Sequence, residues 1–304
     1  MNYFEAIMMG AIQGITELFP VSSLGHAVLI PALIGGTWAK DLSVSTPESP
    51  YLAFIVGLHV ATALALFVFF RRDWVRIIRG LFSSIKNRRI HTAPERLFWL
   101  LVIATIPVGI TGLLLEHTFR TVLGKPIPAA IFLMINGLVL GSGELLRRRA
   151  VRRSEIIELA TVELRDRDAL GDDAVLATIP RWRAVAIGAA QTLALLPGIS
   201  RSGVAMVGGM AVGLSHREAA RFSFLLATPV ILAAGLLKIP DLFGPLGNGI
   251  QGQVLAGSLA AFVAALVAVG FLDRYFRTRT LLPFAVYSLI AGAGSLVWLV
   301  LHGQ

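Results

Sequence analysis

The chain has 304 residues, of which 56% are hydrophobic and only 15% are charged, and its mean hydropathy is +0.75. Soluble domains contain about 25% charged residues, so this composition indicates an integral membrane protein and excludes an ordinary soluble enzyme. The net charge is +9, but the arginines concentrate in short loops, which argues against nucleic-acid binding, and the absence of cysteine excludes disulfides and thiolate chemistry.

Six uninterrupted apolar stretches have the length of membrane-spanning helices. A hydrocarbon core about 30 Å thick is crossed by roughly 20 helical residues. The stretches of this length cover residues 52–70, 98–115, 128–146, 222–238, 253–272 and 282–301. Two further apolar segments, 4–36 and 184–214, are too long and too interrupted to be single spans. We therefore predict an all-α membrane protein with six spans and two broken segments.

The two broken segments carry the same unusual residues 178 positions apart. In an ungapped overlay Gln13 meets Gln191, Ser22 meets Ser200, Ser23 meets Arg201 and Gly25 meets Gly203. Proline, glycine and adjacent hydroxyls are disfavoured in a lipid-exposed helix, because they free or compete for backbone hydrogen bonds that hydrocarbon cannot replace. Broken segments at corresponding places in two halves indicate a binding site near the membrane midplane.

Basic residues predict the side of the membrane on which each loop lies. The loops after 52–70, 128–146 and 253–272 are rich in arginine, whereas residues 37–51, 116–127 and 239–252 carry few or no basic residues. The first three loops are therefore expected in the cytoplasm and the other three outside. Only one ordinary span separates Arg183, expected inside, from residue 239, expected outside. The segment 184–214 must then return to the side on which it starts, and by analogy 4–36 does the same.

The predicted fold is therefore an inverted repeat, in which each half contains one re-entrant helical hairpin and three transmembrane helices. Residues 1–153 form the first repeat and 181–304 the second, and an odd number of crossings turns the second half upside down. A further similarity supports this prediction: Pro128–Phe132 with Gly137 resembles Pro283–Tyr287 with Gly292. The alternative is six unrelated spans with two segments lying on the surface. The polar stretch 154–180 is expected to be a cytoplasmic connector, partly helical or flexible, and without chemistry.

Glu17 and its neighbours form the first candidate site. Ionisable residues at membrane depth are rare and costly, so each one suggests a function. Glu17 lies close in sequence to Ser22, Ser23 and His26, and a carboxylate, hydroxyls and an imidazole are the parts of a general base and its nucleophile. The alternatives are a solvated Glu17 at the membrane interface and an ordinary buried histidine at position 26.

Arg201 is the second candidate, because a guanidinium between two serines in an apolar segment requires an anion. The planar guanidinium suits phosphate, with which it forms two parallel charge-assisted hydrogen bonds. Gly198 and Gly203 allow the backbone to approach a ligand closely, and exposed helix N-termini attract phosphate. The alternative is a structural Arg201–Glu17 ion pair that joins the two hairpins.

A few other ionisable residues lie in apolar surroundings. His59 lies within a predicted span and is a further candidate. Glu116, His117 and Glu144 fall near predicted span ends and are expected to be solvated. No spacing of His, Asp and Glu indicates a tight metal site, and no glycine-rich phosphate loop follows a strand.

These segments resemble the integral-membrane undecaprenyl-diphosphate phosphatases, also known as the bacitracin-resistance proteins. The first family motif resembles Gln13–His26 and the second resembles Pro197–Gly203. The similarity extends to Phe222–Pro229 and Pro283–Tyr287, so it covers nearly the whole chain apart from the connector. It implies hydrolysis of undecaprenyl diphosphate to the monophosphate in the bacterial cell membrane, which recycles the lipid carrier for peptidoglycan synthesis. It also implies a divalent cation, Mg²⁺ or Ca²⁺, and no organic cofactor, and it leaves a homodimer open.

The resemblance also implies a role for each candidate residue. Ser23 would be the nucleophile or a substrate ligand, and Glu17 a base or the best candidate for a metal-associated carboxylate. His26 would be a proton-transfer partner and Arg201 the clamp on the diphosphate. The residues expected to bind substrate around them are Gln13, Ser22, Gly25, Ser200, Ser202 and Gly203.

The chain departs from the usual family motifs at four positions. Gln13 stands where a glutamate is usual, and Leu24 where a threonine usually precedes the Gly-His pair. His59 replaces the usual glutamine of a span, and Ser288 the usual arginine after the last motif. Because a carboxylate that could hold a cation is lost, we expect a divergent member, with His59 as a candidate replacement base. A paralogue acting on another polyprenyl diphosphate is the alternative.

Two functions fit these expectations. In the first, a phosphatase attacks the terminal phosphorus through a phosphoserine or directly with water, and Arg201 and helix dipoles stabilise the developing charge. In the second, a non-hydrolytic transporter moves lipid phosphate or another anion between leaflets, because inverted repeats with broken helices are transporter architecture. The missing carboxylate at Gln13 would fit lost hydrolysis. In either case the partners are the lipid substrate and the surrounding membrane lipids.

Overall fold

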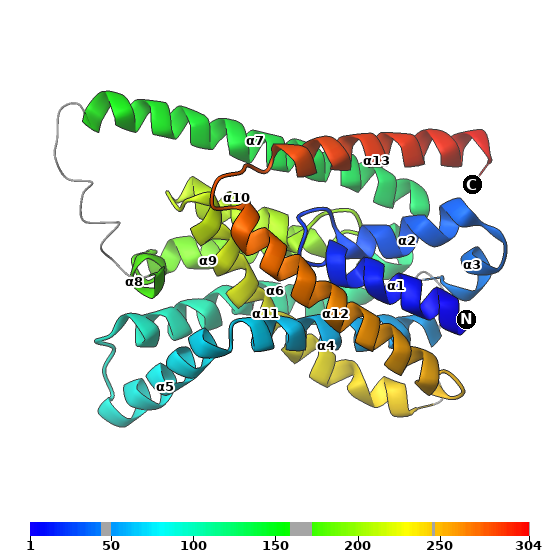
Figure 1. Ribbon diagram of the computed structural model, residues 1–304, viewed down its shortest axis with the longest axis horizontal. Helices are drawn as coiled ribbons and strands as arrows, with labels where there is room; N and C mark the ends of the chain where they lie inside the picture. The colour runs from blue at the N-terminus through cyan, green and yellow to red at the C-terminus, as the bar shows by residue number, and fades with distance from the viewer. Residues whose placement is uncertain (44–49, 159–171, 245–246, 304) are drawn as a thin grey trace.

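The computed structural model describes residues 1–43, 50–158, 172–244 and 247–303 (Figure 1). Within these ranges the secondary structure is entirely helical, so the predicted all-α class is confirmed. In chain order the elements are α1 (Tyr3–Thr16), α2 (Ser23–Ile34), α3 (Gly36–Asp41), α4 (Pro50–Phe69), α5 (Arg71–Asn87), α6 (Ala93–Leu123), α7 (Pro126–Glu158), α8 (Asp172–Ala177), α9 (Arg181–Ala190), the 3-10 helix η1 (Gln191–Leu195), α10 (Arg201–Ala211), α11 (His216–Phe243), α12 (Gln251–Tyr275) and α13 (Leu282–Leu301).

Six helices of the described chain are long and apolar enough to cross a membrane. They are α4, α12 and α13 over their whole length, Ala93–Leu115 of α6, Pro126–Arg149 of α7 and His216–Pro240 of α11. Each of them overlaps one of the six apolar stretches in the sequence. α7 continues to Glu158, beyond the predicted end at residue 146, because the basic run that follows consists largely of good helix formers. Residues 159–171 of the predicted connector lie outside the described residues.

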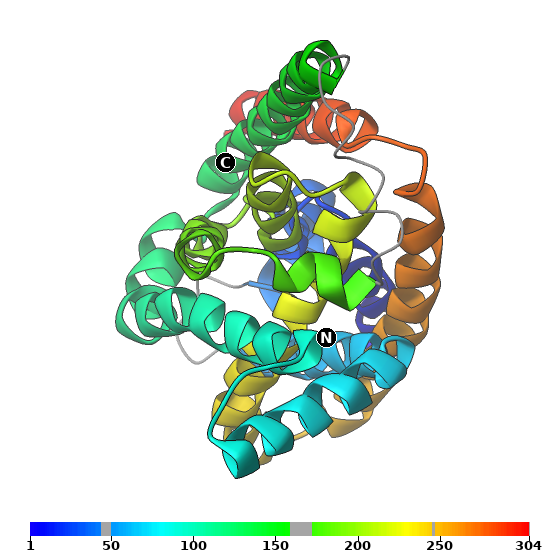
Figure 2. The ribbon, with the colours of Figure 1, turned by 90° about the vertical axis from the view of Figure 1, so that its left-hand side faces the viewer.

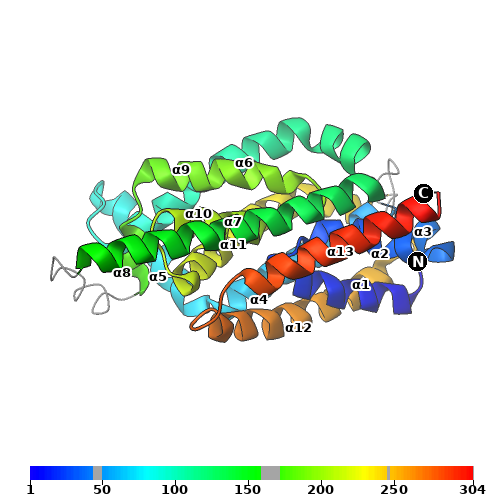
Figure 3. The ribbon, with the colours of Figure 1, turned by 90° about the horizontal axis from the view of Figure 1, so that it is seen from above.

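The long helices enclose the shorter ones. α7 and α13 run side by side along one edge of the molecule, and α12 lies against α1 and α4 (Figures 1 and 3). Seen from the end, α1, α2 and α10 occupy the interior of the ring that the long helices form (Figure 2). The turn between α1 and α2 and the start of α10 therefore lie in the middle of the bundle, whereas α9 lies at its outside beside α6 (Figure 3).

The connections gather at two opposite ends of the molecule. α5, α8, the C-terminal part of α7 and the link between α12 and α13 lie at one end (Figure 1). Both termini, α3, the end of α11 and the start of α12 lie at the other end (Figures 1 and 3). The arginine-rich loops that were expected in the cytoplasm are thus at one end, and the described parts of two loops poor in basic residues, α3 and the residues just before α12, are at the other.

Serine and asparagine caps begin several of these helices. Asn2 and Glu5 form a capping box at α1, in which Asn2 Oδ1 accepts from the Glu5 amide at 2.9 Å and Glu5 Oε2 accepts from the Asn2 amide at 2.8 Å. Ser215 and Glu218 form the same arrangement at α11. Each box satisfies two backbone N–H groups that a helix leaves without an internal partner, so the start of the helix is encoded locally.

α7 and α13 touch through reciprocal glycine contacts. A Cβ added to Gly137 would lie 2.7 Å from the carbonyl oxygen of Ala285, and one added to Gly292 would lie 2.8 Å from that of Ala130. Both distances are shorter than real Cβ contacts, so a larger residue at either position would push the two helices apart. Small residues at such crossings let helix backbones approach closely, which is how helices associate in lipid.

The expectation that Glu144 is solvated was wrong. Its side chain is buried in the structure, and its carboxylate accepts from His216 Nε2 at 2.7 Å and from Arg148 Nε at 3.2 Å. His216 is the first residue of α11, so the start of that helix covers the carboxylate. The position of Glu144 near a span end could not reveal this contact with a distant helix. The side chains of Glu116 and His117 lie outside the described part of the chain.

Candidate active site

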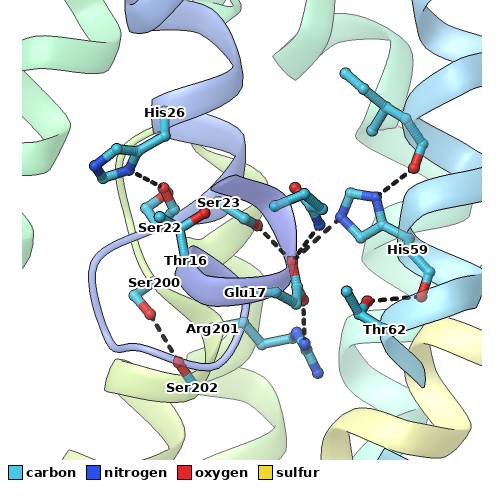
Figure 4. A network of polar contacts seen from close by, with 12 residues as sticks. Thr16, Glu17, Ser22, Ser23, His26, His59, Thr62, Ser200, Arg201 and Ser202 are labelled. Atoms are coloured by element: carbon cyan, nitrogen blue, oxygen red, sulfur yellow. Dashed lines mark hydrogen bonds and ion pairs between the residues drawn. The ribbon is translucent and has the colours of Figure 1, made fainter. Parts of the chain in front are cut away.

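The first break is a turn between α1 and α2 that places polar side chains at its tip (Figure 4). α1 ends at Thr16 with Glu17 as its C-cap, and α2 begins at Ser23. Ser22 caps α2, and its Oγ accepts from the amides of Gly25 at 3.2 Å and Gly198 at 3.1 Å. The φ angle of Ser22 is 68°, which is uncommon for a residue other than glycine. Such strain is concentrated at functional sites, where the surrounding structure holds it in place.

The second break mirrors the first at the start of α10. Ser200 caps this helix, and its Oγ accepts from the Gly203 amide at 3.1 Å, as Ser22 does for Gly25. Arg201 is the first residue of α10, so it stands at a helix N-terminus. Because Ser22 also binds the Gly198 amide, the two turns are in direct contact with each other.

Gly198 lies where these turns and α7 meet. Its φ angle is +113°, and a Cβ added to it would lie 2.4 Å from the carbonyl oxygen of Ala129. We expect Gly198→Ala to lower the thermal unfolding temperature of the purified protein and to impair activity, because backbone strain of about 1–3 kcal/mol adds to the clash. Gly213→Ala is the matched control, since Gly213 has a φ of +96° with nothing within 4 Å. Equal losses for both variants would show that strain alone matters.

Glu17 is the centre of the polar network. Its Oε1 accepts from Arg201 Nη2 at 2.5 Å, and its Oε2 accepts from Ser23 Oγ at 2.5 Å and from Gln13 Nε2 at 2.9 Å. His59 Nε2 lies 3.4 Å from the same Oε2. The carboxylate thus joins α1, α2, α4 and α10, as Figure 4 shows. The Arg201–Glu17 pair that was an alternative for Arg201 is present, and Glu17 is buried rather than solvated.

This arrangement can activate a nucleophile and hold an anion. A hydroxyl that donates to a buried carboxylate, as Ser23 does, has a base in place for its proton. Arg201 Nη2 is held by Glu17, whereas its Nη1 is buried and has no hydrogen-bond partner in the described chain. A buried guanidinium nitrogen without a partner is suited to a phosphate oxygen.

His26 faces away from this network. Its Nδ1 lies 2.7 Å from the Ser22 carbonyl oxygen and its Nε2 lies 2.7 Å from the Tyr287 hydroxyl. Because a carbonyl only accepts, Nδ1 carries a hydrogen, and in the neutral ring Nε2 accepts from Tyr287. The two rings are nearly parallel, with an angle of 7° and centroids 5.8 Å apart. The contact with Tyr287 was not predicted, although this tyrosine ends one of the motifs noted in the sequence.

Asn136 joins both turns and was missed by the sequence analysis. It is fully buried in α7, where its Nδ2 donates to the Pro20 carbonyl at 2.9 Å and to Ser288 Oγ at 3.2 Å. Its Oδ1 accepts from the Ser200 amide at 2.9 Å. The available signal was a lone asparagine inside an apolar span, a position where polar residues are rare.

Replacing this asparagine tests its role as a link. We expect Asn136→Ala to destabilise the protein by about 2–4 kcal/mol, because three hydrogen bonds are lost and a buried amide and carbonyl are left without partners. Thermal unfolding in detergent measures the effect. Ser142→Ala is the control, since Ser142 lies on the same helix but is bonded only within it, through Oγ to the Val139 carbonyl at 2.8 Å. Unchanged stability of Asn136→Ala would contradict the link.

The remaining candidates lie at the two turns but are occupied with local bonds. Ser200 Oγ and Ser202 Oγ are 3.0 Å apart, and Ser223 Oγ donates to the Ser202 carbonyl at 3.2 Å. A Cβ added to Gly25 would lie 2.9 Å from Gly198 Cα, so the glycine at position 25 allows the backbones of the two turns to pack in direct contact. Gln191, which the overlay matches to Gln13, is buried but makes no hydrogen bond to Glu17. Its side-chain amide has no partner within the described ranges. The two halves therefore match in position but not in chemistry.

The donor set does not provide a coordination shell for Mg²⁺ or Ca²⁺. These cations require several oxygen ligands in a defined geometry. Glu17 is the carboxylate of the network, and both of its oxygens already accept hydrogen bonds from Arg201, Ser23 or Gln13. Across the described residues no group of three or more His, Cys, Asp or Glu side chains could hold a metal ion. The cation that the resemblance implies stays a prediction, and no step below depends on it.

Comparison with known proteins shows the family to which the chain belongs. Residues 6–294 match the family described as bacitracin resistance protein BacA. The chain is 64% identical over 302 residues to the undecaprenyl-diphosphatases of Mycolicibacterium paratuberculosis and Mycobacterium avium, with 99% of each chain covered. It is 51% identical to undecaprenyl-diphosphatase 1 of Frankia casuarinae, with 96% of both chains covered. At these identities the chain is not particularly divergent, which corrects that expectation. The chain belongs to the bacitracin resistance protein BacA family.

Proposed function

We propose that this protein hydrolyses undecaprenyl diphosphate to undecaprenyl phosphate and inorganic phosphate in the bacterial cell membrane. Relatives that match it over nearly their whole length are named undecaprenyl-diphosphatases and come from bacteria. The observation that carries the proposal is the 2.5 Å contact between Ser23 Oγ and Glu17, whose other oxygen holds Arg201. The nucleophile Ser23 and the anion-binding guanidinium of Arg201 thus contact the same buried carboxylate, which is the proposed base.

In the proposed reaction Ser23 Oγ attacks the terminal phosphorus and passes its proton to Glu17. A new bond forms between Oγ and phosphorus while the bridging P–O bond breaks, and undecaprenyl phosphate leaves. Water then attacks the phosphoserine, inorganic phosphate is released, and Ser23 regains a proton. If water attacks the diphosphate directly, Glu17 takes its proton in the same way. Arg201 neutralises the charge on the non-bridging phosphate oxygens, which is the main contribution a protein makes to phosphoryl transfer.

His26 and Arg201 have further parts in this proposal. Because His26 Nδ1 donates to the carbonyl of Ser22, the imidazole orients the peptide that precedes the nucleophile. Arg201 binds Glu17 with Nη2 while its Nη1 is without a partner, so it can contact a phosphate before the ion pair breaks. Once the phosphate takes both nitrogens, Glu17 is released to act as a base.

We further propose that the fold is an inverted repeat with two re-entrant hairpins. The reciprocal contacts of Gly137 with Ala285 and of Gly292 with Ala130 are those expected of a two-fold axis between α7 and α13. A second pair supports it: a Cβ on Gly10 would lie 2.1 Å from a carbonyl of α12, and one on Gly188 would lie 2.0 Å from a carbonyl of α6. α6 and α12 are the middle long helices of their halves.

Release of phosphate by the purified, full-length protein tests the proposed function. The protein in detergent is given undecaprenyl diphosphate and shorter prenyl diphosphates, and phosphate is measured beside the Ser23→Ala variant. We expect the wild type to release phosphate and the variant to release none, while the two proteins unfold at the same temperature. A folded wild-type protein that releases no phosphate but moves lipid phosphate across vesicle membranes would support the transporter instead.

A further inference from the structure

α5 (Arg71–Asn87) differs from the other long helices because it is not apolar enough to cross a membrane. It begins two residues after α4 ends at Phe69, at the end of the molecule where the basic loops gather (Figure 1). One face packs inward, with Trp74, Ile77 and Gly80 buried. A Cβ on Gly80 would lie 2.8 Å from the Glu95 amide, so α5 is pressed against the start of α6. α5 is therefore held between the end of candidate span α4 and the start of candidate span α6.

A second face of α5 exposes large apolar side chains. Val75, Ile78, Phe82 and Ile85 are 46%, 37%, 67% and 59% exposed. Their spacing of three, four and three residues places them in one stripe along the helix. Apolar residues gathered in this way mark a surface that is covered by a partner or by lipid.

A third face carries positive charge. Arg72, Arg79 and Lys86 are exposed and recur every seven residues, so they form a stripe roughly 80° around the helix axis from the apolar one. Arg76 points elsewhere and pairs with Asp73 and, at 2.9 Å, with Asp173 of α8. Asp73 and Asp173 are thus paired with Arg76 and not with the basic stripe, which faces outward beside the apolar stripe.

We propose that α5 lies in the headgroup layer of the membrane and that its basic stripe binds the phosphates of anionic phospholipids. The apolar stripe would then enter the acyl region, as in helices that lie parallel to the membrane surface. Basic side chains next to such a stripe reach headgroups with their charged ends and are attracted to an anionic surface. Lipid fits better than a protein partner, because α5 starts where α4 leaves the bilayer.

The absence of cysteine makes the position of α5 directly measurable. A bimane probe is attached to the Phe82→Cys variant and, as a control, to Asn87→Cys, since Asn87 is exposed on the opposite side of the helix. Both full-length proteins are reconstituted in vesicles of equal phosphatidylcholine and phosphatidylglycerol. We expect bromine on the acyl chains to quench the probe at position 82 several-fold more than that at 87, and aqueous iodide to do the reverse.

The preference for anionic headgroups is tested in the same vesicles. Bromine is placed on the acyl chains of only one of the two lipids at a time. Quenching at position 82 should be at least about twofold stronger with brominated phosphatidylglycerol, and Arg72→Gln, Arg79→Gln and Lys86→Gln together should remove this difference. Equal quenching by both lipids with the basic stripe intact would overturn the headgroup site. Stronger iodide quenching at 82, or protection from both quenchers, would show that water or protein covers the stripe and would overturn the proposal.

Discussion

Phosphate release by a Glu17→Gln variant is expected to be about 1,000-fold slower than by the wild type, through kcat rather than KM. Glutamine has nearly the same shape as glutamate but cannot accept the proton of Ser23. It also leaves Arg201 without the carboxylate that its Nη2 contacts at 2.5 Å. Steady-state kinetics of purified protein measure the loss, and thermal unfolding shows whether the fold is intact.

Glu144→Gln is the matched control for this variant. Glu144 is also a buried carboxylate with two basic partners, Arg148 and His216, but it lies between α7 and the start of α11. We expect Glu144→Gln to lower stability while kcat changes little. If Glu144→Gln and Glu17→Gln lost activity to the same degree, the effect would come from breaking a buried ion pair and not from a missing base.

The Glu17→Gln and Ser23→Ala changes should not multiply when they are combined. When two residues act together in one step, removing either one already loses nearly all of the rate acceleration that the pair provides. The double variant is therefore expected to be about as slow as the slower single variant. Independent, multiplying losses would mean that Glu17 is not the base for Ser23.

Arg201→Lys is expected to reduce kcat/KM about 100-fold although the positive charge is retained. The planar guanidinium can hold Glu17 with Nη2 and a phosphate oxygen with Nη1, whereas an ammonium offers neither the reach nor the two parallel donors. Arg201→Ala should be slower still, by about 10⁴-fold relative to the wild type, because charge on the phosphate oxygens is then uncompensated. Initial rates over a range of substrate concentrations distinguish the two variants.

Arg148→Lys is the control for a conservative change in an arginine that pairs with a buried glutamate. Arg148 Nε lies 3.2 Å from Glu144, and half of its side chain is exposed. We expect normal phosphate release from this variant. Full activity of Arg201→Lys would contradict the clamp, since charge alone would then suffice.

Composition and the length of the apolar stretches were enough to predict the class of this protein. The deficit of charge and the six apolar stretches follow from the cost of polar groups in hydrocarbon, which acts on every residue of a span. The two broken segments were found because proline, glycine and serine there conflict with the same requirement. Glu17, Ser23 and Arg201 could be chosen as candidates for that reason, and the structure joins them through one carboxylate.

Contacts between helices far apart in the chain could not be predicted from the sequence and are seen only in the tertiary structure. Asn136 is an isolated asparagine in the sequence, and only the packing of α7 against both turns gives it Pro20 and Ser200 as partners. Tyr287 reaches His26 across 261 positions of the chain. Glu144 was expected in water and is covered by the first residue of α11. A hydrogen bond depends on the direction of two side chains, which sequence spacing defines within one helix but not between helices.

The sequence by itself determined that this is a helical membrane protein and which two segments carry its polar residues, because the bilayer excludes unpaired polar groups wherever they occur. Only the tertiary structure decided that one carboxylate binds the serine and the arginine together, that His26 turns toward Tyr287, and that α5 exposes adjacent apolar and basic stripes. These features depend on how helices far apart in the chain are oriented against one another, and close packing of small residues sets that orientation.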